Sequence, residues 1–311
     1  MVTLLSAIMM INMNFSVIIP TYKREDDLGD CLESIVCQSL LPNRVFLVDD
    51  DELSGEFVFR WKADLSDKGI DLVHYVKDHS FEPRGSNESR NKGLALAIEE
   101  IVFIFDDDII LEDGFFEAII KTWNECDSKN LIGVGGVIKN NRKQGVLENF
   151  YAKVFGLAGE SDWDVNDVAF QSWNDWIIER KKGYYIHGGV CLYRRSSALD
   201  IGGFTIFEGG RGGLVDPDFC LKAKKAGYHF MIEPQAKAIH NHSPSGREGS
   251  FLSGWKEGYN RKRIFKDHCE KTLKTRLWFG WANIGWILRQ FLTGKFAKGV
   301  GMVKGLLTPQ K

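Results

Sequence analysis

A chain of 311 residues with 44% hydrophobic and 26% charged residues can bury a sizeable core, which excludes a disordered or collagen-like protein. The formal net charge is -2, but residues 251–311 carry 13 Lys or Arg against three acidic residues, a net +10 that leaves -12 on the remainder. We therefore expect one α/β domain with a basic C-terminal appendage. Membrane phospholipid and nucleic acid are the candidate anionic partners of that appendage.

The chain lacks the sequence features of a secreted or membrane-spanning protein. Residues 1–14 are apolar without a basic start or a small-residue cleavage site, so we expect an N-terminal tail rather than a signal peptide. The uncharged stretch 277–288 is too short to cross a bilayer core of about 30 Å. The six cysteines form no CxxC pair, and we expect buried thiols in a reducing compartment, the cytoplasm.

Strands and helices alternate through the first hundred residues. Short apolar, β-branched runs predict strands at 15–20, 44–49, 70–76 and 101–105. Apolar residues at helical spacing predict helices at 25–38, 57–65 and 87–98, the last capped by Ser86 or Asn87. This order implies right-handed βαβ crossovers and a mainly parallel sheet, whose ligands bind at the carboxyl ends of the strands.

The second half is less regular. Residues 140–182 show no clear period, whereas 184–193 predict a strand containing Gly188-Gly189 and 216–226 predict a helix. A last strand ends at His242, and residues 243–254 have the composition of a flexible loop. We expect two halves of one domain, at 15–138 and 139–245, followed by a loop with a basic amphipathic helical extension at 246–311.

Three aspartates, Asp106, Asp107 and Asp108, follow the strand that ends at Phe105. Carboxylates so close together repel one another in a partly desolvated cleft, and a divalent cation relieves that repulsion. Oxygen ligands suit Mg²⁺ or Mn²⁺, which can also bridge to a diphosphate. The sequence therefore predicts a metal site, with an ordinary acidic turn as the alternative.

Seven short motifs occur in order between Phe15 and His242. They are Val17 to Arg24 (VIIPTYKR), Val48-Asp49-Asp50, Ser89 to Gly93 (SRNKG), the aspartate triplet, Gly188 to Arg195, Ile201 to Phe204 (IGGF) and Val215 to Asp218 (VDPD). Each is common alone, whereas their order and spacing are specific. On these motifs the chain resembles family 2 glycosyltransferases of the bacterial cell-surface polysaccharide type. The resemblance implies a GT-A-like fold and transfer from a nucleotide-diphospho-sugar, most simply a UDP-sugar, with Mn²⁺ or Mg²⁺. It also implies that residues 15–138 form the nucleotide-sugar-binding half and residues 139–245 the acceptor-binding half.

The resemblance also implies roles for individual residues. With these roles, the predicted nucleotide-binding residues are Pro20, Thr21, Tyr22, Arg24, Asp49, Asp50, Arg90, Asp106, Asp107 and Arg247. Asp49 would read the base, Arg90 would hold ribose or phosphate, and Asp108 would bind the metal directly, with Asp106 on the ribose side. The alternative for Arg90 is a helix-surface residue. The family's glycine-serine turn after the second strand is replaced here by residues 51–55, so that turn must be built differently.

Transfer to an acceptor hydroxyl needs one general base. By the resemblance, Asp216 occupies the position of the base in the family's glutamate-aspartate motif, and Val215 replaces the usual acidic first residue of that motif. Asp218 is the alternative candidate for the base. Asp218 has an alternative role as a carboxylate favoured by the helix dipole. Inversion of configuration follows from the resemblance and a single base.

Two histidines, His240 and His242, share one face of the last strand, and at least one is expected to complete the metal shell or to contact the diphosphate. The loop that carries Arg247 is expected to close over the donor.

The basic extension has an amphipathic, aromatic pattern beyond Phe251. It fits either an anionic membrane surface bound through 251–311 or a helix pair packed on the catalytic domain. We expect a saccharide or lipid-linked acceptor and a peripheral position on the inner face of the cytoplasmic membrane. The competing hypotheses are a haloacid-type phosphatase and a nucleotide- or nucleic-acid-binding module. The acidic body argues against a nucleic acid partner.

Overall fold

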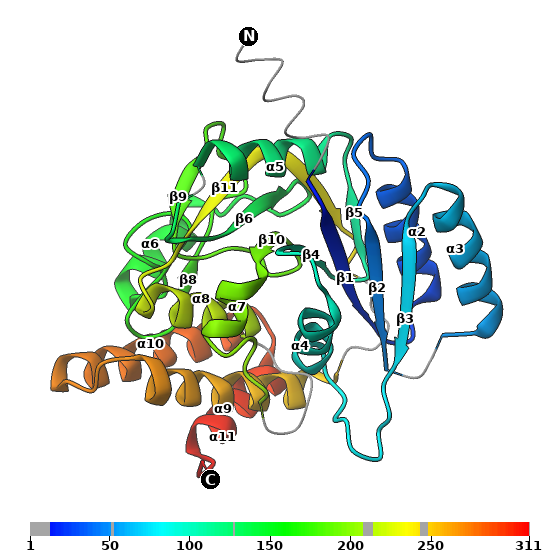
Figure 1. Cartoon of the computed structure of the whole chain (residues 1–311). Helices are drawn as coiled ribbons and strands as arrows, with labels where there is room; N and C mark the ends of the chain where they lie inside the picture. Colours follow the sequence, from blue (N-terminus) through cyan, green and yellow to red (C-terminus); the bar gives the residue numbers. More distant parts are fainter. Residues whose placement is uncertain (1–12, 51–52, 127, 208–213, 243–247, 311) are drawn as a thin grey trace.

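The computed structural model describes residues 13–50, 53–126, 128–207, 214–242 and 248–310. Its centre is a nine-stranded sheet with helices on both faces, and three helices at the C-terminal end lie below it (Figure 1). The strand order across the sheet is β3-β2-β1-β4-β10-β6-β11-β5, with β9 paired to β11. A separate hydrophobic cluster is buried on each face of the sheet. The predicted α/β fold class is confirmed.

The first half follows the predicted alternation of strands and helices. Its elements are β1 (Phe15–Thr21), α2 (Glu25–Val36), β2 (Arg44–Asp49), α3 (Gly55–Asp67), β3 (Asp71–Val76), α4 (Ser86–Leu96) and β4 (Ile101–Phe105). These four strands pair in parallel. The predicted cap of α4 is wrong, because Gly85 is the N-cap residue and Ser86 already belongs to the helix. Ser54 caps α3 by accepting a hydrogen bond from the Phe57 amide at 3.3 Å.

The second half inserts antiparallel strands into the sheet. Its elements are β5 (Ile109–Leu111), α5 (Phe115–Cys126), β6 (Leu131–Ile138), α6 (Val146–Phe155), β7 (Asp164–Val165), β8 (Gln171–Ser172), β9 (Lys181–Gly183), β10 (Val190–Arg194), α7 (Arg195–Asp200), α8 (Val215–Lys225) and β11 (His229–His240). β10 runs antiparallel to both β4 and β6. Because β10 begins only at Val190, the predicted strand at 184–193 is wrong over 184–189. The last strand, β11, ends at His240, so His242 lies beyond it.

Three helices form the C-terminal extension: α9 (Ser250–His268), α10 (Leu273–Leu292) and α11 (Phe296–Leu307). α9 and α11 approach closely at four glycines, where a Cβ atom would collide with the backbone of the other helix. These are Gly254 and Gly258 in α9 and Gly301 and Gly305 in α11. The predicted loop is wrong over 250–254, which begins α9; residues 243–247 lie outside the described residues. Among the described helices, none combines the length and the apolar character needed to cross a bilayer.

The cysteine side chains differ in exposure. Cys31, Cys191, Cys220 and Cys269 are buried as expected, whereas Cys37 is exposed and Cys126 is partly exposed. The expectation of uniformly buried thiols is wrong for the last two, which lie at or near the ends of surface helices.

Candidate functional site

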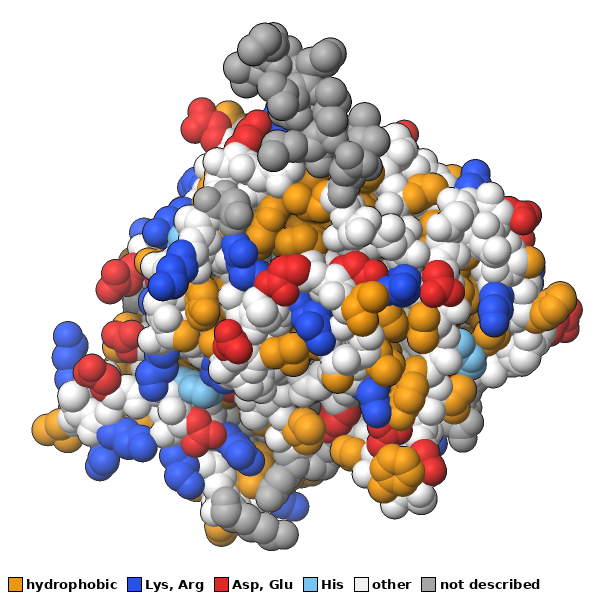
Figure 2. All heavy atoms as spheres, viewed as in Figure 1, with side chains coloured by type: hydrophobic (Ala, Val, Ile, Leu, Met, Phe, Trp, Pro, Cys, Tyr) orange, Lys and Arg blue, Asp and Glu red, His pale blue; other side chains and the backbone are white. Residues whose placement is uncertain are grey.

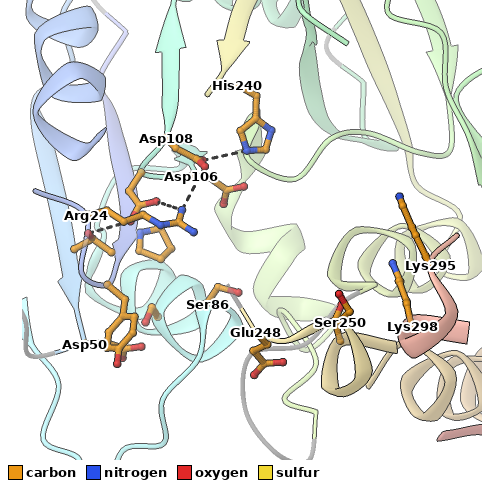
Figure 3. A pocket seen from close by; sticks show the side chains of 16 residues that line it. Arg24, Asp50, Ser86, Asp106, Asp108, His240, Glu248, Ser250, Lys295 and Lys298 are labelled. Atoms are coloured by element: carbon orange, nitrogen blue, oxygen red, sulfur yellow. Dashed lines mark hydrogen bonds and ion pairs between the residues drawn. The ribbon is translucent and has the colours of Figure 1, made fainter. Parts of the chain in front are cut away.

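A cavity of about 690 Å³ opens at the carboxyl ends of β1 and β4 (Figure 3). Its lining residues come from both halves of the chain and from the C-terminal helices. They are Pro20, Thr21, Tyr22, Arg24, Asp50, Ser86, Ser89, Asp106, Asp107, Asp108, His240, Glu248, Ser250, Ser253, Lys295 and Lys298. The cavity is therefore where most of the predicted nucleotide- and metal-binding residues meet.

Arg24 joins the ends of β1 and β4. These two strands are parallel neighbours, so the segments that follow them lie side by side. The Thr21 hydroxyl donates to Asp107 Oδ2 at 3.1 Å, and Arg24 Nη1 donates to Asp107 Oδ1 at 2.8 Å and to Asp108 Oδ2 at 3.3 Å. Burial raises the pKa of Asp107 to about 6, although Arg24 opposes that shift.

Asp106, Asp108 and His240 form a group that fits a metal ion. One ligand atom from each residue lies within 4.8 Å of the other two, and the His240 Nε2 atom is 3.1 Å from Asp108 Oδ1. β11 pairs with β5 so that His240 stands opposite Ile109, next to the aspartate triplet. Two carboxylates and an imidazole fit a divalent cation such as Mn²⁺ or Mg²⁺.

His242 is not a member of this group of three. Its backbone has φ +52°, outside the strand conformation, and its ring packs against the His240 ring with centroids 4.0 Å apart. The predicted metal-ligand role of His242 stays a prediction.

A second arginine, Arg90, lies between Asp106 and Asp216. Its Nη2 atom donates to Asp106 Oδ1 at 2.7 Å, and its Nη1 atom is 3.6 Å from Asp216 Oδ1. Burial would lower the pKa of Arg90, but the two carboxylates outweigh it and raise that pKa. Since Arg90 is only 4% exposed, the alternative of a helix-surface residue is wrong.

Gly188 and Gly189 leave room for these carboxylates. A Cβ atom on Gly188 would collide with the Asp216 side chain, and one on Gly189 would collide with the Asp106 side chain. The Gly188 backbone also hydrogen-bonds to Asp216. This packing explains why β10 begins only at Val190: the preceding residues pass over the site instead of joining the sheet.

The geometry separates the two candidate bases in α8. Asp216 borders a smaller cavity of about 310 Å³, which Arg90 and Asp106 also line. Asp218 is 2% exposed and accepts a hydrogen bond from His268 Nε2 at 2.8 Å. Burial raises the pKa of Asp216 against the opposing effect of Arg90, which suits a group that must accept a proton. Asp218 instead fastens α8 to α9.

The carboxylates after β2 differ in position. Asp49 is buried with its Oδ2 atom 3.0 Å from His74 Nε2, and it is not among the cavity-lining residues. Asp50 lines the cavity, and its Oδ1 atom is 2.5 Å from Lys77 Nζ. Base recognition by Asp49 stays a prediction, and Arg247 lies outside the described residues.

The sequence did not identify the wall opposite the aspartates. Lys295 and Lys298, at the start of α11, line the cavity together with residues around the start of α9 (Figure 3). The sequence placed both lysines in the extension that was expected to bind a membrane or pack on the domain. The packing of α11 on α9, through glycines four residues apart in each helix, brings them to the cavity, and these glycines are the sequence signal that could have indicated it.

Known proteins resemble this chain in sequence. The family model described as Glycosyl transferase family 2 matches residues 16–201. An uncharacterized glycosyltransferase of Bacillus subtilis, YwdF, is 26% identical over 264 residues, covering 85% of this chain and 87% of the relative. A glucosyl-dolichyl phosphate glucuronosyltransferase of Haloferax volcanii is 24% identical over 261 residues, covering 80% and 77%.

Solved structures share the fold at low sequence identity. The mannosyltransferase PcManGT of Pyrobaculum calidifontis, in complex with GDP-Man and Mn²⁺, aligns with a TM-score of 0.60 at 18% identity, over 94% of this chain and 87% of that one. Residues 1–349 of TarS from S. aureus, in complex with UDP-GlcNAc, align with a TM-score of 0.53 at 14% identity, over 94% and 90%.

Proposed function

We propose a reaction for this chain from the premise that it belongs to glycosyltransferase family 2. It moves a sugar from a nucleotide-diphospho-sugar to an acceptor hydroxyl with inversion of configuration, and the transfer depends on a divalent cation. The single observation that carries this proposal is Arg90, which contacts both Asp106 of the metal-binding group and Asp216, the candidate base. The family assignment excludes the phosphatase hypothesis and that of a non-enzymatic binding module.

Each end of the site has its own task. Asp106, Asp108 and His240 would hold Mn²⁺, which when bound stabilises negative charge on the departing diphosphate. Asp216 takes the proton of the attacking acceptor hydroxyl, and its raised pKa makes it a better proton acceptor than an ordinary aspartate. Arg90 fixes the distance between the two ends, so the acceptor and the donor are held in position to react.

The donor and acceptor are proposed by class. The donor is a UDP-sugar, held near Thr21, Tyr22, Arg24 and Asp50 in the 690 Å³ cavity. The acceptor is a saccharide or a lipid-linked glycan of surface polysaccharide synthesis, met at the cytoplasmic face of the membrane. The Haloferax relative, whose name gives a dolichyl phosphate substrate, supports a lipid-linked acceptor.

A panel of nucleotide sugars tests this proposal. We expect one UDP-sugar to raise the melting temperature of the protein only when Mn²⁺ is present, because a ligand that binds the native state alone stabilises it. The same donor should then be consumed with an acceptor, and proton NMR of the product should show the inverted anomer. Metal-independent transfer, or a retained anomer, contradicts the proposed reaction.

A further inference from the structure

Helix α10 carries an exposed apolar stripe along its whole length. Six side chains between 40% and 75% exposed follow one another at three- or four-residue spacing, so they lie on one face of the helix. They are Leu273, Leu277, Trp281, Ile284, Leu288 and Leu292. At 1.5 Å per residue the stripe is about 30 Å long. A single exposed leucine needs no explanation, whereas an aligned set of this length does.

Helix α6 continues the same apolar surface. None of its ten residues is buried, and four apolar side chains on one face are between 47% and 86% exposed: Val146, Leu147, Phe150 and Val154. An isolated helix of ten residues is marginal in water, so α6 depends on its contacts with other parts of the protein.

The two helices are joined along their length. Phe155 stacks on Trp281 with ring centroids 4.8 Å apart, and Trp281 Nε1 donates to the Val154 carbonyl at 2.8 Å. The Tyr151 hydroxyl donates to the Gly285 carbonyl at 2.7 Å. Because Val154 and Trp281 belong to the two exposed sets, the sets meet in one surface, which we call the α6–α10 face.

The residues around the α6–α10 face are strongly basic. Residues 142–155 and 271–295 together contain eight Lys or Arg and one acidic residue, Glu148. Glu148 already pairs with Arg142 at 2.6 Å and with Arg289 at 3.2 Å. Lys and Arg side chains gather at the lower left of the molecule in Figure 2, where Figure 1 places the outer end of α10. The rest of the chain has a net negative charge, so this region attracts anions more strongly than the rest does.

We propose that the α6–α10 face docks on an anionic lipid bilayer. Apolar side chains flanked by Lys and Arg on a helix that lies parallel to a surface are the chemistry of an interfacial helix. The apolar set enters the boundary between headgroups and acyl chains, and the cations contact the anionic headgroups. A nucleic acid would match the charges but would leave the ten apolar side chains in water.

The α6–α10 face ends close to the 690 Å³ cavity. Leu292, the last residue of the stripe, is three residues before Lys295, which lines the 690 Å³ cavity. A docked molecule therefore holds the wall formed by Lys295 close to the bilayer. If the chain has the proposed function, an acceptor carried on a membrane lipid could then reach the cavity without leaving the bilayer.

Vesicle flotation tests the proposal with the full chain. The vesicles contain phosphatidylcholine alone or with phosphatidylglycerol. We expect binding only to the mixed vesicles and binding that weakens with added salt. Leu277→Ser with Leu288→Ser, and separately Lys274→Gln with Arg276→Gln, should each weaken binding by roughly tenfold or more. Phe59→Ser with Lys62→Gln, on the exposed surface of α3, is the matched control and should bind like the wild type.

Two further readouts keep the outcome clear. Melting temperature checks that the variants fold, and Mn²⁺-dependent donor hydrolysis in solution should be unchanged, since none of the substituted residues lines the cavity. Equal binding to neutral vesicles, or an equal loss of binding in the control, would overturn the proposal. A wild-type protein that is a dimer in light scattering, with variants that are monomers, would overturn it as well. The last result would assign the face to a second copy of the chain.

Discussion

Arg24 and Arg90 each bind two aspartates, but they serve different ends of one site. Arg24 joins Asp107 and Asp108 beside β1, whereas Arg90 joins Asp106 to Asp216 in α8. The Arg24 side chain is 17% exposed and the Arg90 side chain is 5% exposed. The difference teaches that three consecutive aspartates do not act as one unit. Arg90 links Asp106 to Asp216, the proposed base, whereas Arg24 links Asp107 and Asp108 beside β1.

The largest effect is expected at Asp108. Asp108→Asn removes a charged ligand from the metal-binding group, and we expect Mn²⁺-dependent transfer to fall on the order of ten-thousandfold. The measurement is the initial rate of transfer over a range of Mn²⁺ concentrations. A variant that recovers the wild-type rate at high Mn²⁺ would show that Asp108 only tunes metal affinity.

Asp216 is expected to give the next largest effect. Asp216→Asn removes the proton acceptor, and we expect kcat to fall roughly a thousandfold while the KM for the donor changes little. Asp218→Asn is the matched control in the same helix turn. It replaces the charged acceptor of the hydrogen bond from His268 by a neutral amide oxygen, and the weaker bond should lower the free energy of unfolding by about 1–3 kcal/mol with kcat nearly unchanged. The opposite pattern would make Asp218 the base.

The pH dependence separates the two arginines. An aspartate with a raised pKa loses its basic form as the pH falls through that pKa. We therefore expect kcat to fall on the acid side of its pH profile, the acid limb, at a pH above the ordinary aspartate pKa of about 3.9. Arg90 opposes the rise, so Arg90→Gln should move the limb to still higher pH. Arg24→Gln should leave it in place. If the limb belongs to Asp107, whose pKa burial raises to about 6, Arg24→Gln moves it instead.

The smallest effect is expected on the far wall of the cavity. Lys295→Gln removes one exposed cation that faces the aspartates across the cavity, and we expect the KM for an anionic substrate to rise about threefold at low salt. The difference from wild type should shrink as salt is added. Lys304→Gln, a basic residue of α11 that does not line the cavity, is the matched control. A kcat loss without a KM change would contradict a binding role.

The regular half of the fold was predictable from the sequence, because β1, β2 and β4 are almost entirely buried on both faces. β2 and β4 have the predicted bounds, and the carboxyl ends of β1 and β4 bring Arg24 to the aspartate triplet. The alternating apolar runs encode this arrangement directly.

Other elements depend on contacts that no local pattern reveals. β10 is shorter than predicted because Gly188 and Gly189 pass over two carboxylates, and a glycine pair by itself does not say what it faces. α6 was not predicted, although Val146, Leu147, Phe150 and Val154 share one face of this ten-residue helix. The bridge from Arg90 to Asp216 joins α4 to α8, and such a contact emerges only from the folded chain.

The most direct test of the two-ended site compares donor binding in Asp108→Asn and Asp216→Asn. Thermal stabilisation by the nucleotide sugar with Mn²⁺ is measured for both variants and for the wild type. The division of tasks predicts that Asp216→Asn keeps the stabilisation without transferring sugar, whereas Asp108→Asn loses both. Equal loss of stabilisation in the two variants, or transfer by Asp216→Asn at the wild-type rate, would contradict it.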